Sequence, residues 1–254
     1  MQITADEARA LGPFTWLKKP AVDGPPAQRD PLVVERVSEM LAHIERDGLD
    51  AVRSYAKDLD GWTGNLEVAS ADLRKSGDAL PADVRAALEL GYDRTNRFAT
   101  AQRTHLSDFE VDVAPGVVGG VQYIPVSRVG AYLPAGRFPL LASAFMTVGV
   151  AKAAGVPTVL ACTPPSGDDG AHPAVLYGAY LSGADRVFAI GGVQALGAMA
   201  FGLLDEAPVD MLVGAGNAFV TEAKRQLFGR VGIDLLAGPS EVAVLADETA
   251  NPEW

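Results

Sequence analysis

Short apolar segments alternate with helical segments from residue 129 to residue 238, and this alternation is the feature that most restricts the fold. Apolar strands that alternate with helices are typical of a parallel sheet whose two faces are both covered. The expected strands are residues 129–133, 158–163, 186–190, 211–213 and 233–236. The expected helices are residues 141–154, 173–182, 193–201 and 217–228. The pattern therefore predicts an α/β protein with a doubly wound, Rossmann-like parallel sheet.

The chain before this region is expected to be mainly helical. The first thirty residues are rich in proline and are interpreted as an irregular arm. Apolar residues at helical spacing predict one helix from about Val33 to Gly48 and a second over residues 49–59. A longer helix is expected after Pro81, because proline suits the first turn of a helix. Its apolar face is expected to hold Val84, Leu88, Tyr92, Thr95 and Phe98.

The sequence divides into four parts. Residues 1–108 form the N-terminal arm and helices, and residues 109–128 alternate in a way that predicts a connecting antiparallel β meander. Residues 129–238 form the Rossmann-like lobe. Residues 239–254 form the last part, with a further strand expected at 241–246.

The composition excludes several classes of function. The chain of 254 residues has 32 Asp and Glu against 21 Lys and Arg, so its net charge is −11. Nucleic-acid binding needs a basic face, so no nucleic-acid partner is expected. Cys162 is the only cysteine, which excludes a disulfide within the chain and is typical of the cytosol. We find no secretory signal and no apolar run near the roughly 20 residues of a membrane span, so a cytoplasmic protein with no membrane partner is expected.

Two glycine turns each follow an expected strand and precede an expected helix. One is Gly214-Ala-Gly216-Asn217, in which Phe219 stands where the dinucleotide fingerprint requires a third glycine. It is either a nucleotide-binding loop or a tight turn with Asn217 as the helix N-cap. The other turn contains Gln194, whose amide either contacts a ligand or lies in solvent. Both turns end parallel strands, so they would face one crevice.

Other chemistries find less support in the residues. Gly238-Pro-Ser240-Glu-Val242 lacks the second glycine of a nucleophile elbow, and the three histidines lie in unrelated contexts. The spacing of His and Cys suggests no metal site within this chain. Arg137, in the loop after the first strand, either holds an anionic ligand or forms an ion pair. Lys224 and its neighbour Arg225 are expected on a solvent-exposed helix face.

Four motifs together resemble the NAD- and zinc-dependent histidinol dehydrogenase family: "VGAYLPAG", "GGVQALGAMAFG", "GNAFVTEAKRQ" and "IDLLAGPSEVAVLAD". The resemblance covers at least residues 129–247. It implies that residues 239–254 begin a return into a companion lobe that is incomplete. It implies oxidation of a primary alcohol to a carboxylate through the aldehyde, with two hydride transfers to NAD. L-histidinol to L-histidine, a step of histidine biosynthesis, is the defining reaction. The resemblance further implies that Tyr132, Gln194 and Asn217 contact NAD, that Ser240 contacts substrate, and that the full-length form is a homodimer.

Three departures from the family pattern matter. The turn before Asn217 reads Gly-Ala-Gly-Asn, where the family usually has Gly-Pro-Gly-Asn. The stretch "AGRFPLLASAFM", which includes Arg137, is closer to the sulfopropanediol dehydrogenase branch, so a sulfonated alcohol is an alternative substrate. The resemblance implies that the zinc ligands and the general base of the family would follow residue 254. We therefore expect no catalytic and no metal-binding residue within this chain and an inactive isolated chain, the alternative being a non-catalytic, truncated nucleotide-binding remnant.

Overall fold

The computed structural model describes residues 30–135, 138–167, 170–237, 244, 246–247 and 249–251. The chain divides into two units, Met1–Asp30 and Pro31–Trp254, and the description below concerns the second. The strand expected at 241–246 and the irregular arm lie mostly or wholly outside the described residues. The four-part domain division stays a prediction.

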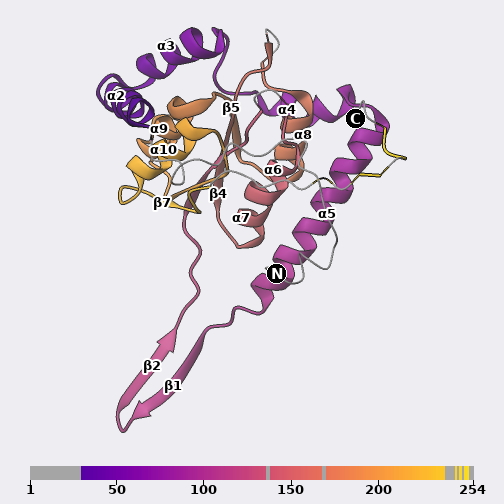
Figure 1. Cartoon of the computed structure of the whole chain (residues 1–254). Helices are drawn as coiled ribbons and strands as arrows, with labels where there is room; N and C mark the ends of the chain where they lie inside the picture. The colour runs from indigo at the N-terminus through magenta and orange to yellow at the C-terminus, as the bar shows by residue number, and fades with distance from the viewer. Residues whose placement is uncertain are drawn as a thin grey trace, which may run out of the picture. The chain divides into compact units, whose positions relative to one another are not determined.

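A five-stranded parallel sheet forms the centre of the second unit (Figure 1). The strands are β3 (Arg128–Tyr132), β4 (Thr158–Thr163), β5 (Arg186–Ala189), β6 (Met211–Val213) and β7 (Gly232–Ile233). They lie in the order β5-β4-β3-β6-β7, and every neighbouring pair is parallel. All five expected strands are present, although β7 is shorter than expected and begins one residue earlier. The prediction of a parallel α/β sheet is confirmed.

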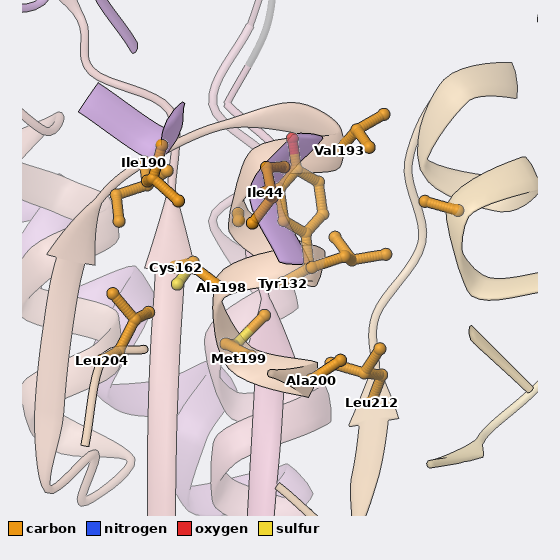
Figure 2. Packing of buried hydrophobic residues seen from close by; sticks show 14 of the residues in the cluster. Ile44, Tyr132, Cys162, Ile190, Val193, Ala198, Met199, Ala200, Leu204 and Leu212 are labelled. Carbon is orange, nitrogen blue, oxygen red and sulfur yellow. The ribbon is translucent and has the colours of Figure 1, made fainter. Parts of the chain in front are cut away.

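Side chains alternate between the two faces of the sheet, and each face has its own core. Leu160 and Leu212 belong to one cluster, which we call the α9 core, together with Tyr132 and Cys162. Figure 2 shows Leu212, Tyr132 and Cys162 in this core. Their neighbours along the strands, such as Val159, belong to the other cluster, which we call the α8 core. Because consecutive strand residues point to opposite faces, apolar side chains at consecutive positions require cover on both sides. This explains why the strand sequences are apolar almost throughout.

Four helices cover the α9 core: α2 (Pro31–Asp47), α3 (Leu49–Asp60), α9 (Gly192–Ala200) and α10 (Ala218–Leu227). Figure 1 shows α9 and α10 beside α2. Helix α2 buries Val37, Met40, Leu41 and Ile44, which share one helical face. Helix α9 is buried from Val193 to Ala200, and Gly197 allows α2 to approach, since a Cβ there would lie 3.2 Å from Ile44 Cδ1.

The α8 core is covered by α4 (Ser70–Lys75), α8 (Pro173–Leu181) and one helical stretch expected at 141–154. That stretch is observed as three joined pieces: α6 (Ala142–Ala144), a π-helical turn η2 (Phe145–Gly149) and α7 (Val150–Ala153). Thr147 Oγ1 donates to the Ser143 carbonyl oxygen at 2.6 Å inside this stretch. Helix α4 and the short 3₁₀ helix η1 (Ser76–Ala79) lack a pattern that the sequence analysis recognised.

Helix α5 (Ala82–Thr104) packs outside this layer, on η2 and α8. Leu88 of α5 lies in a small cluster with Phe145 and Tyr177. The expected apolar face is wrong at Phe98, which is 68% exposed, while its neighbour Ala99 is buried. Consecutive helix residues are separated by about 100° around the axis, so burying one leaves the other on the flank.

The expected meander is observed as one antiparallel hairpin, β1 (Phe109–Ala114) and β2 (Val117–Val121). Gly116, at the tip, has a φ of 76°, which favours glycine. Residues 122–127 form no strand. None of the helices in the described part of the chain is long and apolar enough to cross a membrane.

Candidate functional site

A cleft of about 740 Å³ opens at the carboxyl ends of the strands. Strand order explains its position. The chain moves outward from β3 through β4 to β5, with its connecting helices on the α8 core, and then returns to β6 on the other side of β3. The loops after β3 and β6 therefore leave in opposite directions, and a crevice at such a point is the usual ligand site of a doubly wound sheet. The cleft is lined by Arg36, Met40, Leu59, Asp60, Tyr132, Pro134, Ala135, Phe138, Leu140, Pro164, Gly192, Val193, Gln194, Ala215, Gly216, Asn217 and Phe219.

Tyr132 ends β3 and contacts the turn that follows β5. Its hydroxyl oxygen accepts a hydrogen bond from the Gly192 backbone N–H at 3.1 Å. Gly192 has a φ of 56°, so this turn favours glycine. Burial is the main cause that raises the pKa of Tyr132 to about 12. The phenol is therefore protonated at neutral pH and keeps an O–H donor for a further contact.

Gln194 lies in the first turn of α9 and is 1% exposed. Its Nε2 donates to Oδ2 of Asp60 at 2.9 Å, and its Oε1 is buried with no hydrogen-bond partner among the described residues. Partial burial raises the pKa of Asp60 above its usual value, and the hydrogen bonds from Gln194 and the Gly191 backbone N–H only partly offset this rise. The sequence alone is compatible with a Gln194 amide that contacts a ligand and with one that lies in solvent. The structure buries it in the wall of the cleft.

The turn after β6 is a helix cap built from glycines and one asparagine. Asn217 Oδ1 accepts hydrogen bonds from the backbone N–H groups of Phe219 and Val220, each at 3.1 Å, so Asn217 is the N-cap of α10. A Cβ on Gly214 would lie 2.2 Å from the Tyr132 carbonyl oxygen, and its φ of 113° also favours glycine. Asn217 lines the cleft as well. The capping role and a ligand-binding role are therefore compatible.

The prediction for Lys224 is wrong. This residue is buried, with 3% exposure, rather than lying on a solvent-exposed face. Its Nζ donates to the carbonyl oxygens of Gly214 and Leu235, each at 2.9 Å, and pairs with Asp234. Asp234 Oδ2 in turn accepts from the Gly214 N–H at 2.8 Å. The lysine thus ties the glycine turn to the segment after β7.

Asp60 is a cleft residue that contacts Gln194 and that the sequence does not single out. It ends α3 directly before Gly61, whose φ of 66° is that of a helix C-cap, so its sequence context reads only as a helix end. Arg137 and Ser240, expected near the substrate, lie outside the described residues. Cys162 is fully buried, and burial raises the pKa of its thiol strongly.

Each of the three histidines has its own local contacts, on α2, at the start of α8 and at the end of α5. His43 Nδ1 contacts the Tyr55 hydroxyl at 2.9 Å, His172 caps α8, and His105 Nδ1 contacts the Ala101 carbonyl oxygen at 2.8 Å. Within the described residues, no group of three or more His, Cys, Asp or Glu side chains could hold a metal ion. The described residues therefore do not fit a zinc ion.

A doubly wound sheet with a cleft at its switch point defines an α/β protein of the class that binds ligands at the carboxyl ends of its strands. Within that class, the family model described as histidinol dehydrogenase matches residues 25–254. The chain therefore belongs to the histidinol dehydrogenase family. A histidinol dehydrogenase homolog from Ruegeria pomeroyi is 46% identical over 85% of this chain and 50% of its own length.

Two further relatives and one solved structure also match the chain. A sulfopropanediol 3-dehydrogenase from Ruegeria pomeroyi is 42% identical over 93% of this chain and 54% of its own length. A histidinol dehydrogenase from Xylella fastidiosa is 42% identical over 87% and 51%. The crystal structure of histidinol dehydrogenase from Elizabethkingia anophelis matches with a TM-score of 0.78 and 31% identity, over 90% of this chain and 53% of that one. The chain spans about half the length of these relatives.

Proposed function

We propose that this chain supplies the NAD-binding part of an NAD- and zinc-dependent alcohol dehydrogenase. The proposed reaction is oxidation of a primary alcohol to the carboxylate through the aldehyde, with L-histidinol as the first candidate substrate. One observation carries the proposal. Tyr132, Gln194 and Asn217, the residues that the family resemblance assigns to NAD, come from three separate segments and line one cleft.

The cleft has features that suit a dinucleotide. Helices α9 and α10 both begin at the cleft, so the positive ends of two helix dipoles lie beside the ligand. Arg36 and Asp60 are the charged side chains among its lining residues. Apolar side chains such as Met40 and Phe219 supply surface for flat rings. Bound NAD would accept the hydride, while these residues would bind and orient it.

The chemistry at the alcohol needs groups beyond those described. A general base or a metal ion must assist removal of the hydroxyl proton, and the described residues offer no zinc site. The proposal places the zinc ligands and the base in the part of the family enzyme that this chain does not span. Under this proposal, the 254-residue chain binds NAD but does not oxidise an alcohol. The full-length form acts as a homodimer.

Calorimetric titration of the chain with NAD tests the binding step. Gln194→Met keeps the length of the side chain and removes its amide, so we expect the Kd for NAD to rise about tenfold. Gln102→Met, on an exposed position of α5, is the matched control and should leave the Kd unchanged. Equal affinities of wild type and Gln194→Met would count against the cleft as the NAD site.

Reconstitution tests the reaction. A separately produced C-terminal half of a full-length relative, added with Zn²⁺, should restore NADH formation from L-histidinol. NAD binding without any restored activity would favour the alternative, a nucleotide-binding remnant.

A sulfonated alcohol is the second candidate substrate. The similarity to the sulfopropanediol 3-dehydrogenase extends over 93% of the chain, and the segment around Arg137 resembles that branch. If Arg137 holds a sulfonate, Arg137→Ala in the reconstituted enzyme should raise KM for sulfopropanediol and leave KM for NAD nearly unchanged. Equal changes in both constants would indicate a structural arginine.

A further inference from the structure

Gln194 lies in the cleft wall with half of its amide unsatisfied. Its Oε1 is buried without a hydrogen-bond partner among the described residues, which native proteins rarely leave so. This oxygen lies beside Gly192, where a Cβ would stand 3.0 Å from it. Glycine therefore keeps the space next to the oxygen free of a side chain, and both residues line the cleft.

Asp60 determines which end of the Gln194 amide is available for a ligand. Its Oδ2 accepts from Gln194 Nε2 at 2.9 Å, and the Gly191 backbone N–H is a second donor to the same carboxyl group. The Asp60 carboxyl oxygen accepts this hydrogen bond, and Nε2 is the only amide atom of Gln194 that can donate, so the NH₂ end of the amide faces Asp60. The carbonyl oxygen is then the end that remains for another partner.

We propose that Asp60 is a positioning residue, which fixes Gln194 so that its Oε1 accepts a hydrogen bond from an exocyclic NH₂ group of the bound dinucleotide. This inference rests on the proposed function, because it concerns the same NAD cleft. Leu59, Phe138 and Leu140 give the cleft apolar walls that suit a flat ring. An NH₂ group on such a ring is a donor that a buried acceptor would select. NAD has two, the adenine amine and the carboxamide of nicotinamide.

Two analogues of NAD separate these sources. Nicotinamide hypoxanthine dinucleotide has an oxygen in place of the adenine amine, and 3-acetylpyridine adenine dinucleotide has a methyl group in place of the carboxamide NH₂. Kd values for NAD and both analogues are measured by calorimetry with the 254-residue chain. We expect wild type to bind one analogue about tenfold more weakly than NAD, because the buried acceptor loses its donor.

Asp60→Asn should reduce this ratio to less than about threefold. An asparagine side chain can either accept or donate, so it no longer fixes the direction of the Gln194 amide. Gln194→Met, which removes the acceptor itself, should reduce the ratio in the same way. Asp58→Asn is the matched control: it removes the same charge from the same helix, at an exposed carboxylate that accepts from Ser54 Oγ at 3.2 Å. It should keep the wild-type ratio.

A purely structural Asp60 would lower the affinity for all three ligands alike and leave the ratio at its wild-type value. That result overturns the inference. The inference is also overturned if the wild-type chain binds NAD and both analogues with equal affinity. In both cases the proposed function stands. If the wild-type chain binds none of the three ligands, both the proposed function and the inference are wrong.

Discussion

Lys224 Nζ donates a hydrogen bond to the carbonyl oxygen of Gly214 at 2.9 Å, so helix α10 holds the glycine turn that precedes it. The same ammonium group pairs with Asp234, whose other carboxylate oxygen binds the Gly214 N–H. Both backbone groups of Gly214 are thus satisfied by one ion pair, in which Lys224 is buried and Asp234 is partly exposed. The shape of the cleft edge therefore depends on a lysine ten positions away in the sequence.

We expect Lys224→Met to destabilise the protein by about 2–4 kcal/mol, because it leaves the Gly214 and Leu235 carbonyl oxygens and the Asp234 carboxylate without their donor. Asp234 is partly solvated, which limits the loss. Urea unfolding measures the change. Lys57→Met, at an exposed position of α3, is the control and should cost less than about 1 kcal/mol. Equal losses for the two variants would contradict the role assigned to Lys224.

Two glycines separate backbone strain from steric conflict. Gly214 and Gly229 have similar φ angles, 113° and 100°. A Cβ on Gly214 would collide with the Tyr132 carbonyl oxygen, whereas a Cβ on Gly229 would meet nothing within 4 Å. Gly229→Ala should therefore cost only the strain, about 1–2 kcal/mol.

Gly214→Ala adds the collision and a displaced turn to the same strain, so its loss of stability should exceed that of Gly229→Ala by at least about 1 kcal/mol. Thermal unfolding of both variants, measured side by side, gives the comparison. Indistinguishable melting temperatures would mean that β3 and the turn do not approach as closely as the structure shows. The two variants should also differ in NAD affinity, since only Gly214 belongs to the turn at the cleft.

The sequence predicts the sheet well and the polar contacts of the cleft poorly. Apolar runs such as 158–163 and the glycines after 190 and 213 are local signals, and they place both turns on the cleft. Asn217 as an N-cap is likewise a local rule. The partnership of Asp60 with Gln194 and the burial of Lys224 depend instead on segments distant in the sequence. The spacing of residues along the chain does not predict these contacts, because Asp60, Gln194 and Lys224 are polar and their sequence positions are equally compatible with exposure to solvent.

Tyr132 should make stability depend on alkaline pH. Its pKa is about 12 in the folded protein, raised mainly by burial from the ordinary value of 10.0. The folded state thus favours the protonated phenol, and this stabilisation is complete below pH 10. It is lost as the pH rises from 10 to 12, by about 2–3 kcal/mol at most. Urea unfolding from pH 8 to pH 11 measures the slope.

Tyr132→Phe isolates this contribution, since it cannot ionise. The difference in unfolding free energy between wild type and Tyr132→Phe should shrink between pH 10 and pH 11, while groups common to both proteins cancel. At neutral pH the variant should lose about 1 kcal/mol, because the Gly192 N–H loses its acceptor. A difference that stays constant with pH would show that the Tyr132 phenol is not buried in the folded protein.

Ile44 joins the N-terminal helices to the lobe that carries the cleft. Its side chain is fully buried in the α9 core (Figure 2). It packs against the position of Gly197 in α9. Ile44→Ala should destabilise the protein by about 2–5 kcal/mol, through lost burial and the cavity that remains. Leu32→Ala, at a position of the same helix that is 74% exposed, should cost less than about 1 kcal/mol.

The same pair of variants tests whether α2 is part of the ligand site. Arg36 and Met40 of α2 line the cleft, so loosening this helix should also weaken NAD binding. We expect Ile44→Ala to raise the Kd for NAD at a temperature where the variant is still fully folded, and Leu32→Ala to leave it unchanged. A large loss of stability with an unchanged Kd would place NAD against the sheet loops alone. It would then leave α2 with a packing role only.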